Sequence, residues 1–356
     1  MDQVAYRSPT YYELGPPPEL DWRPFRKQNY QEYRRQWDER ALQGEPGLFP
    51  LHLDVDPTNR CNLSCPICPR THYLSSGRQA WNPAGVPGDM DFALYERLIE
   101  EGAAGGLRSV KLNFLGEPLL APRLTDMVRL AAEAGLWVML NTNATLLTEA
   151  KSEALLTAGL TDIFFSFDSP YREEYELARP EADYTRVLAN IRAFMGVRDR
   201  LGLKAVQTRA SMILPEGAGP ESLARIQADY VRLFRGLGVA EIGFGRPTMV
   251  GRDYGRTFGL VPGFVCPDLF RRLFVFWDGP AGPCCGDWER RLPLGRADQE
   301  PLGEIWRGRA YQALRAAHLG GRYGDIPACR SCSVPYLSNL SSEGLFSSGR
   351  VAAEGF

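Results

Sequence analysis

The chain has 356 residues, an ordinary globular composition and a formal net charge of −2. This near-neutral charge excludes a bulk attraction to nucleic acid or to an anionic membrane, and no apolar run approaches the ~18 residues of a membrane span. The N-terminus lacks the charged and then apolar order of a secretory signal, so we expect a cytoplasmic protein whose eight cysteines are reduced.

Residues 1–50 are interpreted as an N-terminal extension, either an arm packed on the main domain or a lid over the substrate. Residues 15–18, Gly-Pro-Pro-Pro, predict a stiff break in this segment. Residues 25–42 are polar, but their large apolar side chains recur at roughly helical spacing and predict one short amphipathic helix: Tyr30, Tyr33, Trp37 and Leu42.

A cysteine-rich loop follows the next strand signal. Residues 51–56 alternate apolar and polar side chains and predict a strand, which residues 57–60 end. Three cysteines then stand in the spacing C-x3-C-x2-C: Cys61, Cys65 and Cys68. Open α/β sheets and barrels place their chemistry beyond the carboxyl ends of their strands, which is where this loop is expected to lie.

Three thiolates are one short of a tetrahedral zinc site, and His72 is the only close candidate for a fourth ligand. An iron–sulfur cluster held by three cysteines instead leaves one iron open to bind and activate a substrate. Three buried cysteines without metal are the remaining alternative, although Asn62, Ser64 and two prolines interrupt any regular element that could bury them.

The segment TNRCNLSCPICPR, residues 58–70, resembles the cluster-binding loop of the radical S-adenosylmethionine (radical SAM) enzymes. The resemblance implies a 4Fe–4S cluster on the three cysteines, whose open iron binds the amino and carboxylate groups of S-adenosylmethionine. It also implies cleavage of that cofactor to a 5′-deoxyadenosyl radical that takes a hydrogen atom from the substrate, with a flavodoxin or ferredoxin as electron donor. In this family the residue before the third cysteine packs near adenine, and here it is Ile67.

Helical and strand patterns then alternate up to residue 247. Helices are predicted over residues 91–102, 124–131, 148–158, 184–195 and 221–234, and strands over residues 109–114, 136–140, 162–167, 205–214 and 240–245. Such alternation with short loops indicates an α/β fold with a parallel sheet and right-handed crossovers. With the first strand this makes six strands, and the resemblance implies a partial (β/α)6 barrel over residues 51–247.

Polar groups follow the second predicted strand, where the chain reads Leu115-Gly116-Glu117-Pro118. This run is similar to the Gly-Gly-Glu motif of the family, with Leu115 in place of the first glycine. The resemblance implies that Gly116, Glu117 and Pro118 hold the amino group of S-adenosylmethionine, and a carboxylate with exposed backbone carbonyls suits an ammonium ion. A plain turn with a solvated glutamate is the alternative.

The next strands also end in polar groups. Asn141-Thr142-Asn143, close to the family's Thr-Asn-Gly, ends the third strand, and Ser166-Phe167-Asp168 ends the fourth. Asn141, Asn143, Ser166 and Asp168 could bind the ribose hydroxyls and the methionine carboxylate. Arg209 on the fifth strand could meet a carboxylate or stand in solvent.

Five further cysteines follow residue 260: Cys266, Cys284, Cys285, Cys329 and Cys332. Residues 273–279 between them predict a hairpin-like strand and turn. A split pair and a C-x2-C pair could together hold zinc or a second iron–sulfur cluster, and the spacing alone leaves both open.

The pattern C-x12-G-x4-C followed by a distant C-x2-C resembles the SPASM/twitch extension of radical SAM enzymes. The resemblance implies an auxiliary 4Fe–4S cluster in a small domain over residues 248–340, before a tail at 341–356, with these ligands: Cys266, Cys284, Cys329 and Cys332. The two-cluster form of the extension would carry cysteines where this chain has Ser338 and Ser342, so we expect one auxiliary cluster. Cys285 is left over, as a small structural residue or as a hydrogen-atom donor.

These features predict an oxidoreductase that dehydrogenates a small polyol, sugar or aminocyclitol, with no nucleic-acid or membrane partner. The basis is one auxiliary cluster, no further domain for a leader peptide, and an arm plus linker (246–263) of a size to roof a small pocket. The alternatives are a sugar epimerase that uses Cys285 as hydrogen donor, a ribosomal-peptide maturase, and a non-catalytic metal-binding scaffold.

Overall fold

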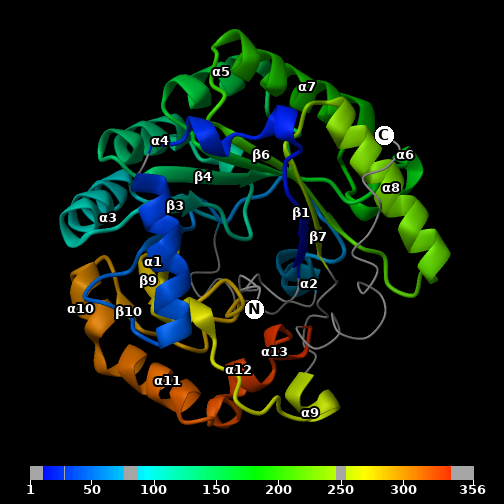
Figure 1. Ribbon diagram of the computed structural model, residues 1–356. Coiled ribbons are helices and arrows are strands. Elements are labelled where there is room, and N and C mark those ends of the chain that lie inside the picture. Colours follow the sequence, from blue (N-terminus) through cyan, green and yellow to red (C-terminus); the bar gives the residue numbers. More distant parts are fainter. Residues whose placement is uncertain (1–10, 28, 76–86, 246–253, 338–356) are drawn as a thin grey trace.

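The computed structural model describes residues 11–27, 29–75, 87–245 and 254–337 (Figure 1). Six parallel strands form the barrel wall: β2 (His52–Val55), β3 (Ser109–Leu112), β4 (Trp137–Thr142), β5 (Asp162–Ser166), β6 (Gln207–Ile213) and β7 (Glu241–Gly245). They lie side by side in chain order. The six predicted strands of an α/β partial barrel are therefore confirmed.

Helices cover the outer side of this curved sheet (Figure 1). They are α3 (Phe92–Gly105), α4 (Leu124–Glu133), α5 (Glu149–Thr157), α6 (Arg172–Ala178), α7 (Tyr184–Arg200) and α8 (Pro220–Gly236). The short helix α6 was not predicted. Alternate strand residues such as Leu53, Val110 and Val138 are fully buried in the apolar core beneath these helices. The intervening residues, many of them polar, therefore face the inside of the barrel.

The sheet is larger than the sequence predicts, because it has ten strands. Strand β1 (Tyr11–Leu14) pairs antiparallel with β7, and β8 (Arg272–Val275) pairs parallel with β2. Strands β9 (Pro280–Gly282) and β10 (Gly295–Arg296) continue from β8. The predicted hairpin near residue 275 exists, but its first strand belongs to the barrel sheet, so the sheet runs across the boundary predicted at residues 247–248.

After β1, the described part of the N-terminal extension packs at the amino ends of the barrel strands. Helix α1 (Asn29–Gln43) buries Tyr33, whose hydroxyl accepts a 2.8 Å hydrogen bond from Ser109. Arg26 lies 4.7 Å from the ring centre of Trp137 and forms a buried 3.1 Å ion pair with Asp162. This segment therefore closes the end of the barrel opposite to the loop after β2.

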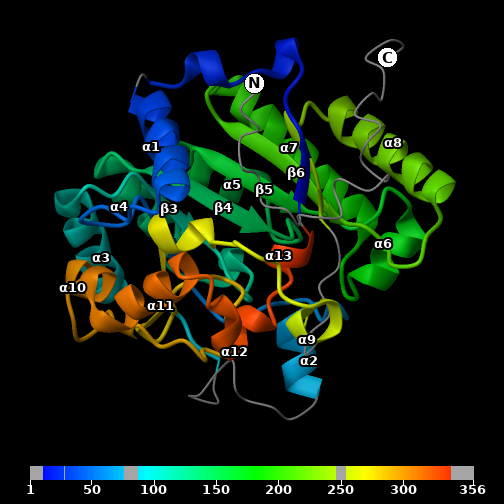
Figure 2. The same cartoon turned by 60° about the horizontal axis from the view of Figure 1, so that its bottom comes forward.

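The C-terminal part contributes short elements beside that loop. Helix α2 (Pro69–Ser75) follows the three-cysteine loop, and α12 (Pro327–Arg330) contains Cys329. Helix α13 (Val334–Leu337) follows α12, and Figure 2 places α2 and α12 at the lower side of the molecule. The remaining helices are α9 (Tyr254–Phe258), α10 (Leu302–Arg307) and α11 (Arg309–Leu319). Among the described helices, none is both long and apolar enough to cross a membrane.

Three expectations fall on residues that the structure does not describe. These are most of the linker expected to help roof the pocket, the positions of the two serines that replace second-cluster cysteines, and the predicted tail. The residues concerned are 246–253 and 338–356.

Candidate functional site

The three-cysteine loop, residues 61–68, lies at the carboxyl ends of the strands, and all three of its thiols are free and partly exposed. Asn62 joins the loop to the end of β4, because its side chain donates to Thr145 Oγ1 at 2.8 Å and accepts from Asn143 Nδ2 at 3.1 Å. The backbone N–H of Ser64 and its hydroxyl donate to the Glu181 carboxylate at 3.0 and 2.7 Å. Side chains from two neighbouring segments therefore hold the loop in place.

Gly116 sits where the loop after β3 crosses the chain that leads into the cysteines. Glu117 N donates to Arg60 O at 2.7 Å, so the two backbones are in direct contact. A Cβ on Gly116 would lie 2.8 Å from Arg60 O and still closer to Thr58 O. Only glycine allows this approach, which explains why the second position of the motif keeps its glycine although Leu115 replaces the first.

Gly116→Ala should therefore displace the cysteine loop. Because the new methyl group meets backbone oxygens that cannot rotate away, we expect the variant to lose most of the iron bound by this loop. Iron content after anaerobic reconstitution measures the effect. Gly196→Ala is the matched control, since a Cβ there meets nothing within 4 Å, and it should keep the wild-type iron content. Equal iron in both variants would contradict this account of the loop.

The Glu117 carboxylate is buried and already accepts three hydrogen bonds. The donors are Thr142 Oγ1 at 2.6 Å, Asn143 N at 2.8 Å and Leu119 N at 3.2 Å. Burial raises the pKa of Glu117, and these hydrogen bonds oppose that shift. Glu117 thus joins the ends of β3 and β4. An ammonium group of S-adenosylmethionine would find the backbone carbonyls of residues 115–118 as further acceptors, and that binding role stays a prediction.

Three other predicted cofactor residues lie near these strand ends. The Asn141 side-chain oxygen is buried and has no hydrogen-bond partner in the described part of the chain, so it could accept from a ribose hydroxyl. Ile67 exposes 48% of its surface on the cysteine loop, as a side chain that covers adenine would before the cofactor binds. Ser166 is half-buried at the end of β5. These observations fit S-adenosylmethionine.

The charged residues predicted for the site have protein partners. Asp168 pairs with Arg179 at 2.7 Å and accepts from Ile213 N at 3.0 Å. Arg209 faces the barrel interior, where it pairs with Glu13 of β1 and lies 3.7 Å from the ring centre of Phe164. The carboxylate that Arg209 meets is therefore one of the protein's own.

Two residues of the site were missed by the sequence reading. Arg179 and Glu181 lie after α6, and Glu181 adopts a left-handed φ of 70°, which is uncommon for a residue other than glycine. Burial raises the pKa of the Cys65 thiol to about 11, and the positive charge of Arg179 opposes that shift. Arg179 thus lies close enough to favour a thiolate on the loop. No local motif marks either residue.

The four C-terminal cysteines of the predicted auxiliary set are also free and partly buried: Cys266, Cys284, Cys329 and Cys332. Burial raises the pKa of each thiol, and neighbouring thiols raise it further. Within the described residues, no three His, Cys, Asp or Glu side chains come together closely enough to hold one metal ion.

Cys285 differs from its neighbour Cys284, because it is exposed. Desolvation raises the pKa of the Cys285 thiol. Charged side chains on the strands also change this pKa: Arg272 and Lys111 lower it, and Asp54 raises it. Cys285 therefore lies near these three side chains.

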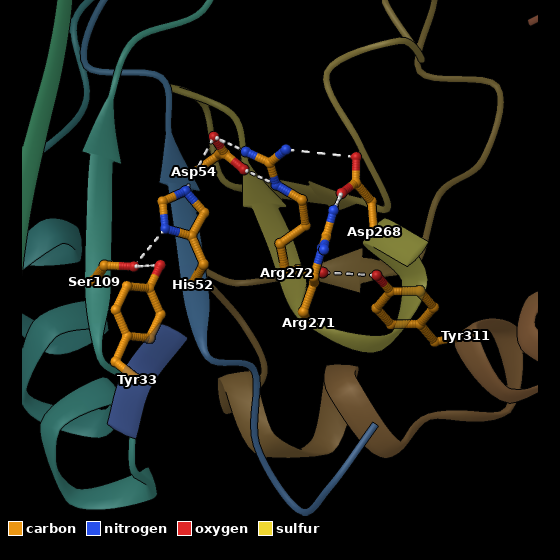
Figure 3. Close-up of polar contacts among 8 residues, drawn as sticks. All are labelled: Tyr33, His52, Asp54, Ser109, Asp268, Arg271, Arg272 and Tyr311. Carbon is orange, nitrogen blue, oxygen red and sulfur yellow. Dashed lines mark hydrogen bonds and ion pairs between the residues drawn. The ribbon is translucent and has the colours of Figure 1, made fainter. Parts of the chain in front are cut away.

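A buried polar network joins β2 and β3 to β8 beneath this region (Figure 3). Arg272 donates to both oxygens of Asp54, at 2.7 and 2.9 Å, and lies 3.5 Å from Asp268. Toward the neighbouring strand β3, His52 Nδ1 lies 2.6 Å from Ser109 Oγ. Asp268 is two residues from Cys266, so the network connects the barrel wall directly to the C-terminal cysteine set.

Comparison with protein families gives two matches. The Radical SAM superfamily matches residues 55–200, and the SPASM family, described as an iron–sulfur cluster-binding domain, matches residues 266–333. The first match contains the three-cysteine loop and the second spans all five C-terminal cysteines.

The curated relatives match over a limited stretch. A tungsten-containing aldehyde ferredoxin oxidoreductase cofactor-modifying protein of Pyrococcus furiosus is 31% identical over 119 residues, 33% of this chain and 30% of that protein. A PqqA peptide cyclase of Gluconobacter oxydans is 36% identical over 118 residues, again 33% of this chain and 30% of that protein. The matched stretch thus spans less than a third of each relative.

Two solved structures share the fold over most of the chain. BtrN in complex with AdoMet and 2-DOIA superposes with a TM-score of 0.51 at 20% identity, covering 80% of this chain and 93% of that chain. SuiB of Streptococcus suis has a TM-score of 0.54 at 15% identity, covering 82% and 74%. At these identities the likeness establishes the fold alone.

Proposed function

Because the chain belongs to the radical SAM superfamily and carries a SPASM iron–sulfur domain, we propose that it dehydrogenates a small polyol, sugar or aminocyclitol. Its cofactors are S-adenosylmethionine, a 4Fe–4S cluster that binds it, and an auxiliary 4Fe–4S cluster. When bound, these groups supply hydrogen-atom removal from carbon by a 5′-deoxyadenosyl radical and uptake of one electron from the substrate.

The observation that carries the proposal is the second cysteine set beside the barrel. Asp268, next to Cys266, is linked through Arg272 to Asp54 on the barrel wall. An electron acceptor held by these cysteines would therefore stand near a substrate inside the barrel. Removal of a hydrogen atom, a proton and an electron from an H–C–O–H group would leave a ketone, and a cluster held by these cysteines would supply an acceptor for that electron.

The chain's own residues prepare this reaction by positioning and by excluding water. Glu117, Asn143 and Asn62 connect the ends of β3 and β4 to the three-cysteine loop. The described N-terminal segment closes the opposite end of the barrel, where Arg26 and Asp162 form their buried pair. A substrate would thus enter from the end that carries the cysteines.

The likeness to BtrN supports a small substrate, because that protein is seen with 2-DOIA and this chain covers 93% of it. A second candidate is peptide modification. The PqqA peptide cyclase matches the barrel region, and SuiB is seen bound to its precursor peptide SuiA. Membership of the superfamily supports an enzyme over the non-catalytic scaffold.

Deuterium transfer tests the proposal. The reconstituted enzyme is incubated without oxygen with S-adenosylmethionine, a reductant and carbon-deuterated polyols, sugars or aminocyclitols, each offered singly. We expect deuterium in 5′-deoxyadenosine and a ketone product from at least one of them, detected by mass spectrometry.

The competing outcomes are distinct. A product that is lighter than the deuterated substrate by one deuterium-for-hydrogen replacement, with solvent hydrogen at an inverted carbon, would favour the epimerase that uses Cys285. Deuterium transfer from a deuterated peptide alone would favour the maturase and overturn the oxidation of a small polyol.

A further inference from the structure

Lysine is rare in this chain, and one lysine stands inside the barrel. The chain has 41 lysines and arginines together, of which only four are lysines: Lys27, Lys111, Lys151 and Lys204. Lys111 lies in the middle of β3, in register with Asp54 on β2 and Met139 on β4. Its neighbours Val110 and Leu112 are fully buried on the helix side, so Lys111 points into the barrel.

Arg272 and Arg209 also lie on the inner side of the barrel sheet, and both have carboxylate partners. Lys111 has no such partner among the described residues. Arg272 pairs with Asp54 and Asp268, and Arg209 pairs with Glu13. The Lys111 ammonium makes no hydrogen bond or ion pair with any residue that the structure describes, and its nearest aromatic contact is the Phe164 ring centre at 5.8 Å. Asp54 lies nearby in register but already accepts two hydrogen bonds from Arg272.

Lys111 is only half-buried, although both flanking strand residues are completely buried. The exposed thiol of Cys285, from the C-terminal segment, is close enough for each group to act on the charge of the other. Lys111 on the barrel wall and Cys285 in the C-terminal segment are therefore neighbours.

We propose that Lys111 binds an anionic group of the substrate, a carboxylate or a phosphate. An ammonium ion held among apolar and already paired groups gains most from an anion that enters with the ligand, and lysine is a common ligand for both groups. The proposal rests on the proposed function and narrows it, from polyols in general to acidic polyols such as sugar acids or sugar phosphates.

The charge balance around Lys111 supports this assignment. Burial lowers the pKa of Lys111 to about 8, Asp54 opposes that shift, and Arg272 and Arg209 strengthen it. His52 on β2 and the Cys285 thiol complete the titratable groups around it. A bound anion would oppose this shift and favour the charged form of Lys111.

Competitive acetylation tests the site directly on the holoenzyme. The anaerobic, S-adenosylmethionine-bound enzyme is treated with a trace of labelled acetic anhydride, and peptide mass spectrometry measures the labelling of all four lysines. The probes are inorganic phosphate and acetate, each compared with chloride at equal ionic strength. We expect phosphate, acetate or both to slow acetylation of Lys111 while the exposed Lys204 reacts as before. The anion that protects identifies the preferred group. Equal labelling of Lys111 in all three salts would overturn the proposal.

Variants give a second readout, the binding of the same anions by calorimetry. Lys111→Met keeps the length of the side chain without its charge, and should weaken binding about tenfold or more, the worth of one charged hydrogen bond. Lys111→Arg should retain part of the affinity. Lys204→Met removes the same charge from an exposed site and should bind as the wild type does. Unchanged binding by Lys111→Met would contradict the assignment.

Failure of this inference and failure of the proposed function are distinguishable. If an acidic polyol is oxidised equally well by the wild type and by Lys111→Met, the anion site is wrong and the oxidation stands. If phosphate protects Lys111 but no polyol transfers deuterium, the anion site stands and the oxidation is wrong.

Discussion

Replacement of Cys61, Cys65 and Cys68 together by alanine should abolish 5′-deoxyadenosine formation and leave the auxiliary cluster in place. The three thiols belong to one loop, whereas the other set comes from residues 266–332, so the two centres have no ligand in common. The wild type should bind about eight irons in two four-iron clusters, and the variant about four. Iron analysis and chromatography of the cleavage products after anaerobic reconstitution measure both effects.

Cys285→Ala is the control for this experiment, because Cys285 is the cysteine left outside both predicted sets. It should keep about eight irons. A triple variant that keeps all its iron, or still forms 5′-deoxyadenosine, would show that the loop does not hold the cofactor-binding cluster. Loss of four irons in Cys285→Ala would mean that Cys285, and not Cys284, belongs to the auxiliary set.

Arg272→Met should be strongly destabilising, by about 3–5 kcal/mol, the usual effect of removing one partner from a buried ion pair. Asp54 is buried on β2 and loses both of its strongest hydrogen bonds, and Asp268 loses a second positive neighbour. Arg232→Met is the matched control. Its side chain is 64% exposed and pairs with Asp229 within one helix, so we expect a change below about 1 kcal/mol.

The destabilisation of Arg272→Met should also depend on pH. Burial alone would raise the pKa of Asp54, but Arg272 and then His52 outweigh it and hold that pKa well below the usual range. A lowered folded-state pKa stabilises the protein above the unfolded value, near 4, and this contribution is lost as the pH falls further. The difference in melting temperature between wild type and variant should therefore shrink below about pH 4. A constant difference down to pH 3 would contradict the pairing.

Local patterns in the sequence were sufficient to predict the barrel, and the two sets of cysteine ligands stay predictions. Strand and helix periods predicted β2 to β7, because these parallel strands are largely buried and helices alternate with them along the chain. The pairing of β8 with β2 joins distant parts of the chain, and it brings Arg272 to Asp54, 218 positions away. No local pattern reports such a contact. For the same reason the additional antiparallel strand β1 was missed.

The contacts that orient the site were harder to predict from the sequence than the cysteine motifs were. Glu117 was predicted from its motif as a cofactor contact, but its hydrogen bonds to Thr142 and Asn143 emerge only when β3 and β4 lie side by side. Glu181 reaches the cysteine loop across 117 positions. The lack of a partner for Lys111 among the described residues depends on Arg272 having taken Asp54, which again requires the folded sheet.

The proposed oxidation depends on an auxiliary cluster that accepts the substrate electron. A variant that lacks this cluster tests that role. Cys329→Ala combined with Cys332→Ala removes the C-x2-C half of the set and leaves the three-cysteine loop untouched. With a polyol that the wild type oxidises, we expect this variant to form 5′-deoxyadenosine and to yield no ketone, because the substrate electron has no acceptor. Ketone formation at the wild-type rate, with the auxiliary iron gone, would contradict the account.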